Sequence, residues 1–98
     1  MNDEDKIKNI RRHIDRIDTV IITALAERMS LMPDIADYKN KNDVPIFDEE
    51  REVEIMNKLK KISKDHGLDE GFVEEIFLSC FNESKRIQND VISKAKPE

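Results

Sequence analysis

The stretch from Ile7 to Lys39 reads IKNIRRHIDRIDTVIITALAERMSLMPDIADYK, and it decides the fold because two sets of positions recur in it every seven residues. One set contains Ile7, Ile14, Ile21, Arg28 and Ile35, and the other contains Ile10, Ile17, Ala24, Leu31 and Tyr38. Two mostly apolar positions in a seven-residue repeat form a continuous seam along an α-helix. The spacing predicts one long helix over about Lys6–Lys39.

The length of this seam indicates a partner chain. Five heptads span about 50 Å, whereas the radius of gyration of a compact domain of this length is near 13 Å. One subunit cannot cover such a seam. We therefore expect an intertwined helical-bundle homodimer in which the long helices of two chains pack on each other.

Two shorter helices are expected after the long one, over Glu49–Asp65 and Glu70–Ile92. Asp48 and Asp69 occupy the N-cap positions of these helices, and Gly67 lies where a helix C-terminus favours a residue with positive φ. No segment alternates like a β-strand. The prediction is an all-α fold with three helices per subunit, one long and two shorter.

Composition narrows the class of protein further. The chain has 98 residues, of which 38% are hydrophobic and 40% charged, which is typical of one small domain over 1–98, with a tail at 93–98 that we expect to be frayed. A net charge of −5 with scattered basic residues disfavours nucleic-acid binding. Without a long apolar run or a signal peptide, the expected location is the cytoplasm. Cys80 is the single cysteine, so it is expected to be a small core residue and not part of an internal disulfide.

Arg28 is anomalous because it occupies an apolar position of the seam. Its helical neighbours three and four residues away are Ala24, Leu25, Leu31 and Met32, none of which can pair with a guanidinium. A buried guanidinium is costly unless it meets an anion. Lys39 shares roughly the same helix face about 16 Å further on, so two cations are expected along one wall of a pocket.

The two shorter helices also place polar groups on their apolar faces. Glu52 precedes Ile55, Leu59 and Ile62, whereas Ser84 and Gln88 share a face with Val73, Phe77, Cys80 and Val91. Polar groups from every helix favour a site for a small polyanionic ligand. The alternatives are long cationic side chains at a dimer edge that reach solvent, and ordinary buried hydrogen bonds for Ser84 and Gln88.

Together these motifs resemble the all-α chorismate mutases. The segments that carry the resemblance are IRRHIDRID, LAERMSL, ADYK, VPIFDEERE, HGLDEGFVEEIF and NESKRIQ, which cover nearly the whole chain. The resemblance implies an isomerase that converts chorismate to prephenate in phenylalanine and tyrosine biosynthesis. It also implies a homodimer with two sites at the subunit interface.

By this resemblance, four side chains would be catalytic: Arg28, Lys39, Glu52 and Gln88. Arg28 would hold a substrate carboxylate together with Arg11 of the other subunit, and Lys39 and Gln88 would donate to the ether oxygen. Glu52 and the backbone near Asp48 would bind the ring hydroxyl. Ser84 and Arg51 would face the remaining carboxylate side of the pocket.

The spacing of the two arginines agrees with a shared site. Arg11 and Arg28 are 17 residues apart, which is about 25 Å along a helix and roughly 100° around it. They cannot hold one small ligand from the same chain. An antiparallel partner helix would bring its own Arg11 near Arg28. Without the resemblance, Arg11 would be interpreted as a surface arginine paired with Asp15.

The reaction suits a chain that offers neither a nucleophile with an adjacent base nor a metal-binding pattern. His13 and His66 lie on different expected helices without suitably spaced cysteine or aspartate partners, so no metal and no cofactor are expected. A unimolecular Claisen rearrangement asks the protein to hold a folded conformer and to stabilise charge on the ether oxygen. Arginines suit the first task because they bind carboxylates bidentately.

Two residues depart from the family's pattern. Pro33 lies between Arg28 and Lys39 and is expected to kink the helix, which would alter the placement of Lys39. Phe47 makes the rim of the pocket apolar where many members are basic.

Two other functions remain open. One is an isochorismate pyruvate lyase, which the family also contains; Asp48, Glu52 and Ser84 favour the mutase, because chorismate presents a ring hydroxyl there. The other is a noncatalytic helical dimer that acts as a regulatory module.

Overall fold

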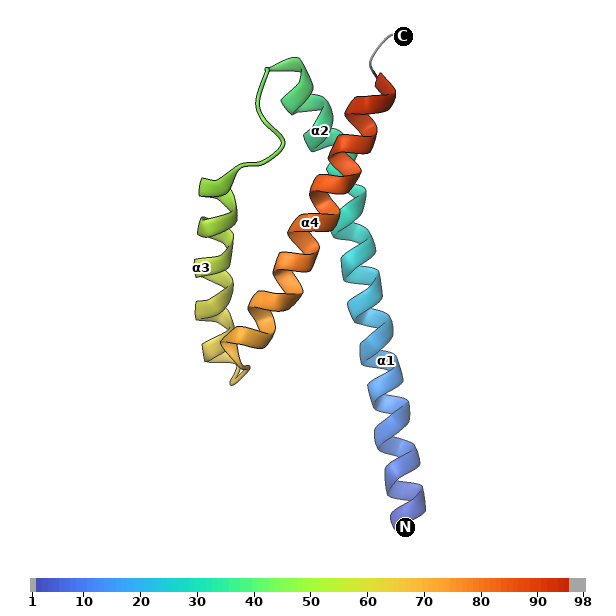
Figure 1. The fold of residues 1–98 in the computed structure, drawn as a ribbon. Helices are drawn as coiled ribbons and strands as arrows, with labels where there is room; N and C mark the ends of the chain where they lie inside the picture. Colours follow the sequence, from blue (N-terminus) through green and yellow to red (C-terminus); the bar gives the residue numbers. More distant parts are fainter. Residues whose placement is uncertain (1, 96–98) are drawn as a thin grey trace. The chain divides into compact units, whose positions relative to one another are not determined.

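The computed structural model describes residues 2–95, and its regular elements over that range are four α-helices without a strand (Figure 1). They are α1 (Asp3–Ser30), α2 (Met32–Lys41), α3 (Glu49–Asp65) and α4 (Glu70–Ala95). The all-α prediction is confirmed. Of the tail at 93–98 that was expected to be frayed, residues up to Ala95 belong to α4 and the rest lies outside the described residues.

The residues predicted to lie at the two ends of the shorter helices occupy those positions. Asp48 accepts a hydrogen bond from the backbone N–H of Arg51 at 3.1 Å, and Asp69 accepts one from that of Phe72 at 2.9 Å. Each aspartate thereby satisfies one of the unpaired N–H groups in the first turn of its helix. Gly67 has a φ of 69° in the turn between α3 and α4, where glycine avoids the steric cost of a side chain.

The predicted first helix is divided at Leu31. This residue is the C-cap of α1, its backbone nitrogen lies 3.4 Å from the carbonyl oxygen of Arg28, and α2 begins at the next residue. Pro33 is therefore the second residue of α2, where a helix has no intrahelical acceptor for a backbone N–H. The break thus lies two residues before the predicted kink.

The chain forms two compact units, one up to Leu31 and one from Met32 onward. In the second unit, α4 packs against both α2 and α3. Figure 1 shows α3 and α4 as a helical hairpin. The buried apolar side chains of this unit are Met32, Ala36, Met56, Val73, Cys80 and Phe81, which confirms Cys80 as a core residue.

The faces of the two shorter helices that were expected to point inward differ in how far they are buried. On α4, Val73, Ser84 and Gln88 are buried as expected. On α3, Met56 is buried, whereas Ile62, which was expected inside, is 41% exposed. Because α3 packs on α4 alone among the described helices of this unit, one narrow stripe of α3 is covered, and Val53 and Ile62 remain exposed.

The first unit is the single helix α1. No residue of Asp3–Ser30 is buried, and the seam isoleucines are between 41% and 54% exposed at Ile7, Ile10, Ile14, Ile17 and Ile21. Despite its apolar seam, α1 is not long and apolar enough to cross a membrane, nor is any other helix among residues 2–95.

Candidate functional site

Lys39 lies near the end of α2 and is held by the loop that leads to α3. Its Nζ donates a hydrogen bond to the carbonyl oxygen of Ile46 at 2.7 Å. Burial lowers the pKa of the Lys39 ammonium, and the nearby carboxylates of Asp48 and Glu52 oppose that shift. The structure therefore brings three of the predicted site residues together from α2 and from the start of α3.

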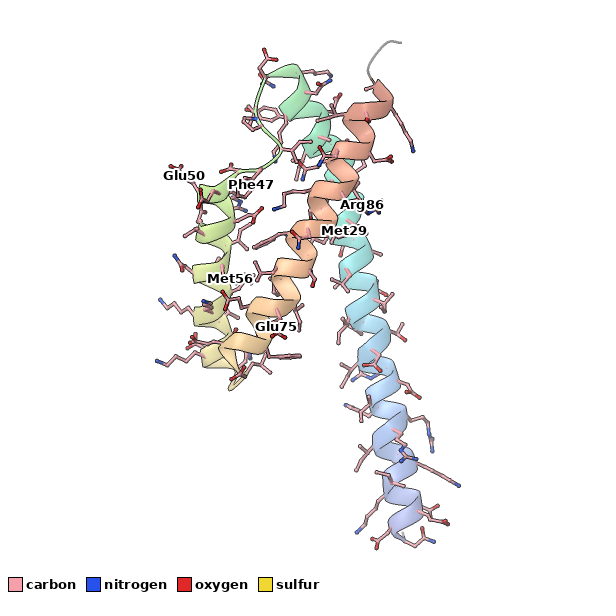
Figure 2. All side chains as sticks on the ribbon, in the orientation of Figure 1. Met29, Phe47, Glu50, Met56, Glu75 and Arg86 are labelled. Carbon is pink, nitrogen blue, oxygen red and sulfur yellow. The ribbon has the colours of Figure 1, made fainter. Side chains whose placement is uncertain are left out.

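Glu52 connects this group to α4. Its carboxylate forms an ion pair with Lys85 at 2.9 Å, with side chains that are 24% and 26% exposed. The Lys85 ammonium also lies 4.6 Å from the centre of the Phe47 ring, within the range of a cation–π interaction. Phe47 lies in the loop just before α3, beside the N-terminal end of that helix (Figure 2). The apolar rim predicted at Phe47 is therefore in contact with a cation, the ammonium group of Lys85.

Arg51 and Asp48 take part in local contacts of the α3 N-terminus. The carboxylate of Asp48 caps the helix, and the Arg51 guanidinium pairs with Glu54 at 2.9 Å on an exposed surface. Substrate binding by Arg51 would require its side chain to leave Glu54, which costs little because exposed ion pairs contribute about 0 to 1 kcal/mol.

Gln88 and Ser84 are buried polar residues one turn apart on α4. The Gln88 Nε2 donates to the sulfur of Met32 at 3.5 Å, and within residues 2–95 its Oε1 has no hydrogen-bond partner. The Ser84 hydroxyl donates to the carbonyl oxygen of Cys80 at 2.8 Å. A buried amide bound to so weak an acceptor as a thioether is suited to receive a polar ligand.

Arg11 and Arg28 belong to α1, which is described by itself. Arg11 is exposed, whereas Arg28 lies half-buried in the last turn. The second unit contains the other six predicted residues, of which Lys39, Asp48 and Glu52 form one electrostatic group and Ser84 and Gln88 share one face of α4.

Lys85 is the residue that sequence reasoning missed. It lies within the segment NESKRIQ, but the resemblance assigns it no role. The signal was present, because Lys85 lies four residues after Phe81 and three before Gln88, both of which are buried. Lys85 is thus a charged residue next to buried positions of α4, just as Arg28 is a charged residue at an apolar position of α1.

All eight predicted site residues, from Arg11 to Gln88, lie within a known sequence pattern. The pattern described as chorismate mutase type II matches residues 10–89, which is most of the chain. The chain belongs to the chorismate mutase type II family.

Relatives with curated names align over nearly the whole chain. The chorismate mutase of Methanocaldococcus jannaschii is 36% identical over 92 residues, which are 94% of this chain and 93% of that protein. The bifunctional chorismate mutase/prephenate dehydratase of Buchnera aphidicola subsp. Schizaphis graminum is 32% identical over 96% of this chain, but the match covers 24% of that protein. The 4-amino-4-deoxychorismate mutase of Streptomyces venezuelae is 26% identical over 96% of this chain and 91% of its own length.

No group of three or more histidine, cysteine or carboxylate side chains in the described part of this family member is arranged to hold a metal ion. Its candidate site instead offers cationic donors, a carboxylate and a neutral amide. Such a set can bind a polyanionic substrate and stabilise developing negative charge.

Proposed function

We infer that this chain is a chorismate mutase, an isomerase that rearranges chorismate to prephenate within one molecule. Family membership and 36% identity to a named chorismate mutase support the activity. The structural observation that carries the proposal is the buried amide of Gln88, held by the sulfur of Met32 on the same unit that contains Lys39 and Glu52.

The rearrangement breaks a carbon–oxygen bond while a carbon–carbon bond forms, and negative charge gathers on the ether oxygen. We propose that Lys39 and Gln88 donate hydrogen bonds to that oxygen. Donors aimed at developing charge lower the barrier because they need little reorganisation during the reaction, and removal of one typically costs about 3 to 4 kcal/mol. The Gln88 amide would exchange a thioether acceptor for an anionic oxygen, which is a stronger acceptor.

The remaining residues would fix the conformer of the substrate. Arg28 and the Arg11 of a partner chain would bind one carboxylate, and Ser84 with Arg51 would face the other carboxylate side. The Glu52 carboxylate would accept a hydrogen bond from the ring hydroxyl, and the backbone near Asp48 would form a second hydrogen bond with that hydroxyl. Holding the substrate in a reactive folded form removes much of the entropic part of the barrier.

We further propose that the site is completed in a homodimer and that 1–98 acts as one domain within it. The support is the exposed isoleucine seam of α1, which a second α1 would cover. If no partner covered this seam, α1 would expose to solvent a long apolar stripe of the kind that marks interaction surfaces. The cytoplasm is the location that we propose for this pathway enzyme, which would supply prephenate for phenylalanine and tyrosine synthesis.

The two alternatives are less well supported. An isochorismate pyruvate lyase has less need of the carboxylates of Asp48 and Glu52, which lie close enough to Lys39 to affect its pKa. A noncatalytic dimer gives no reason for a buried amide beside a thioether.

The deciding experiment incubates the purified chain with chorismate and follows the loss of its ultraviolet absorbance, with prephenate measured separately after acid conversion to phenylpyruvate. Saturable formation of prephenate is the expected result. Pyruvate formation from isochorismate would support the lyase instead, and inertness toward both substrates would leave the regulatory dimer.

A further inference from the structure

Lys85 is placed to control which substituent the substrate ring can present to Glu52. Its ammonium lies 2.9 Å from the Glu52 carboxylate and 4.6 Å from the centre of the Phe47 ring. Residues of α3, of its N-terminal loop and of α4 therefore meet at one point. The Glu52 carboxylate also acts electrostatically on Lys39, where it opposes the lowering of the pKa by burial.

The contacts of Lys85 restrict its ammonium to a defined position. The side chain is 26% exposed, so its charge is partly withdrawn from water. One side of the ammonium meets a carboxylate oxygen and another meets the face of an aromatic ring, two attractions that both depend on positive charge. A carboxylate oxygen has two lone pairs, so Glu52 can still accept a hydrogen bond from a neutral hydroxyl while Lys85 is bound.

We propose that Lys85 is a specificity-determining residue that makes the site select a ring hydroxyl over a ring amine. The proposal rests on the proposed function, in which Glu52 faces the ring hydroxyl of chorismate. A hydroxyl adds one hydrogen bond to a carboxylate already neutralised by Lys85. A protonated amine in the same place, as in 4-amino-4-deoxychorismate, would compete with Lys85 for Glu52 and would be repelled by its ammonium.

Like charges within a few ångströms in a partly desolvated site disfavour binding and also disfavour the transition state. Without the Lys85 charge, Glu52 would be an unpaired carboxylate, which suits an ammonium better than a hydroxyl. Lys85→Met keeps much of the side-chain length and removes the charge. We expect it to lower the ratio of kcat/KM for chorismate to kcat/KM for 4-amino-4-deoxychorismate by about tenfold.

The chain offers a matched control. Lys60 of α3 pairs with Glu74 of α4 at 3.4 Å, so Lys60→Met also removes one ion pair between the same two helices. If Lys85 served only to join α3 to α4, both variants would behave alike. We expect Lys60→Met to leave the substrate ratio at the wild-type value, and Lys85→Arg to retain it because the charge is preserved.

The experiment measures kcat and KM for both substrates with the wild type, Lys85→Met, Lys85→Arg and Lys60→Met, with helicity checked for each by circular dichroism. Phe47→Leu provides a second variant, since loss of the ring leaves the ammonium less fixed and is expected to lower the ratio by a smaller factor. An unchanged ratio in Lys85→Met, or an equal fall in Lys60→Met, would overturn the inference. A wild-type chain that prefers the amine would overturn it while leaving mutase chemistry in place, whereas a wild-type chain inert toward both substrates would overturn the proposed function and the inference with it.

Discussion

The amide nitrogen of Gln88 on α4 donates to the thioether sulfur of Met32 at the start of α2, at 3.5 Å. The two residues are 56 positions apart in the sequence. Sulfur is a weak acceptor, so this hydrogen bond adds little to stability. The contact nevertheless fixes where the amide lies, and the amide can be transferred to a ligand oxygen at small cost.

Gln88→Glu tests whether that amide is a donor in the reaction. An ionised carboxylate would repel the charge that develops on the ether oxygen, whereas a protonated carboxyl can donate to it. We expect kcat of the variant to be about a hundredfold or more below wild type at pH 7.5 and to rise on acidification. The measurement is kcat between pH 4.5 and 8.5.

Asn89→Asp is the matched control, since it makes the same change from amide to carboxylate at an exposed neighbour on α4. It should keep wild-type activity at every pH. Wild-type turnover by Gln88→Glu at pH 7.5, with no rise on acidification, would show that Gln88 does not face the ether oxygen.

Lys39 predicts an alkaline limit to activity. Burial favours the neutral amine and lowers the Lys39 pKa, although Asp48 and Glu52 oppose the shift. Because only the ammonium can donate to the ether oxygen with a positive charge, kcat should fall as the pH rises through this lowered pKa, that is, before an ordinary lysine deprotonates. Lys39→Arg stays protonated and should lose this alkaline limb while retaining some turnover.

The control for this profile is Lys41→Arg, at a lysine of the same helix that pairs with Asp37 in an exposed position. Its pH profile should match that of the wild type. An alkaline limb that persists unchanged in Lys39→Arg would assign the titration to another group.

Most of the fold could be predicted from the sequence, because the signals that define the helices are local. Heptad spacing, the aspartates at the N-caps and Gly67 each act within a few residues, and α3 begins and ends at the predicted positions. The break at Leu31 was not predicted, because the heptad pattern continues through it. Ile62 was misplaced because periodicity defines an apolar stripe and not which part of that stripe a neighbouring helix covers.

The candidate site likewise divides into residues that the sequence could identify and contacts that it could not. Lys39, Glu52 and Gln88 could be named from polar residues on apolar faces together with the resemblance. The ion pair of Lys85 with Glu52 could not, because it joins residues 33 positions apart and depends on how α3 packs on α4. The contact between Gln88 and Met32 is likewise a product of tertiary packing.

Pro33→Ala tests the position of the helix break. An interior proline costs about 3 kcal/mol, whereas one in the first turn of a helix costs little. Since Pro33 is the second residue of α2, we expect the free energy of unfolding to change by less than about 1 kcal/mol. Urea titration followed by circular dichroism measures it. A gain near 3 kcal/mol would mean that Pro33 interrupts a helix that otherwise continues across Leu31.

Arg11 and Arg28 test whether two chains share one site. If Arg28 works with the Arg11 of a partner chain, Arg11→Ala and Arg28→Ala should each be nearly inactive as dimers of one variant. A hybrid of the two variants has both changes in one site and an intact second site. Random mixing gives hybrids for half of the dimers, so about a quarter of wild-type activity should return.

Arg12→Ala provides the control for that mixing experiment, because Arg12 is an exposed neighbour whose guanidinium binds Asn9 on the same helix. It should be active alone, and sedimentation should give the same dimer for all the variants. The mixture is denatured and refolded so that chains exchange, and turnover is then compared with that of each variant refolded separately. If both arginines served a site within one chain, every subunit would carry a damaged site in any combination, and mixing would return no more activity than the two variants show apart.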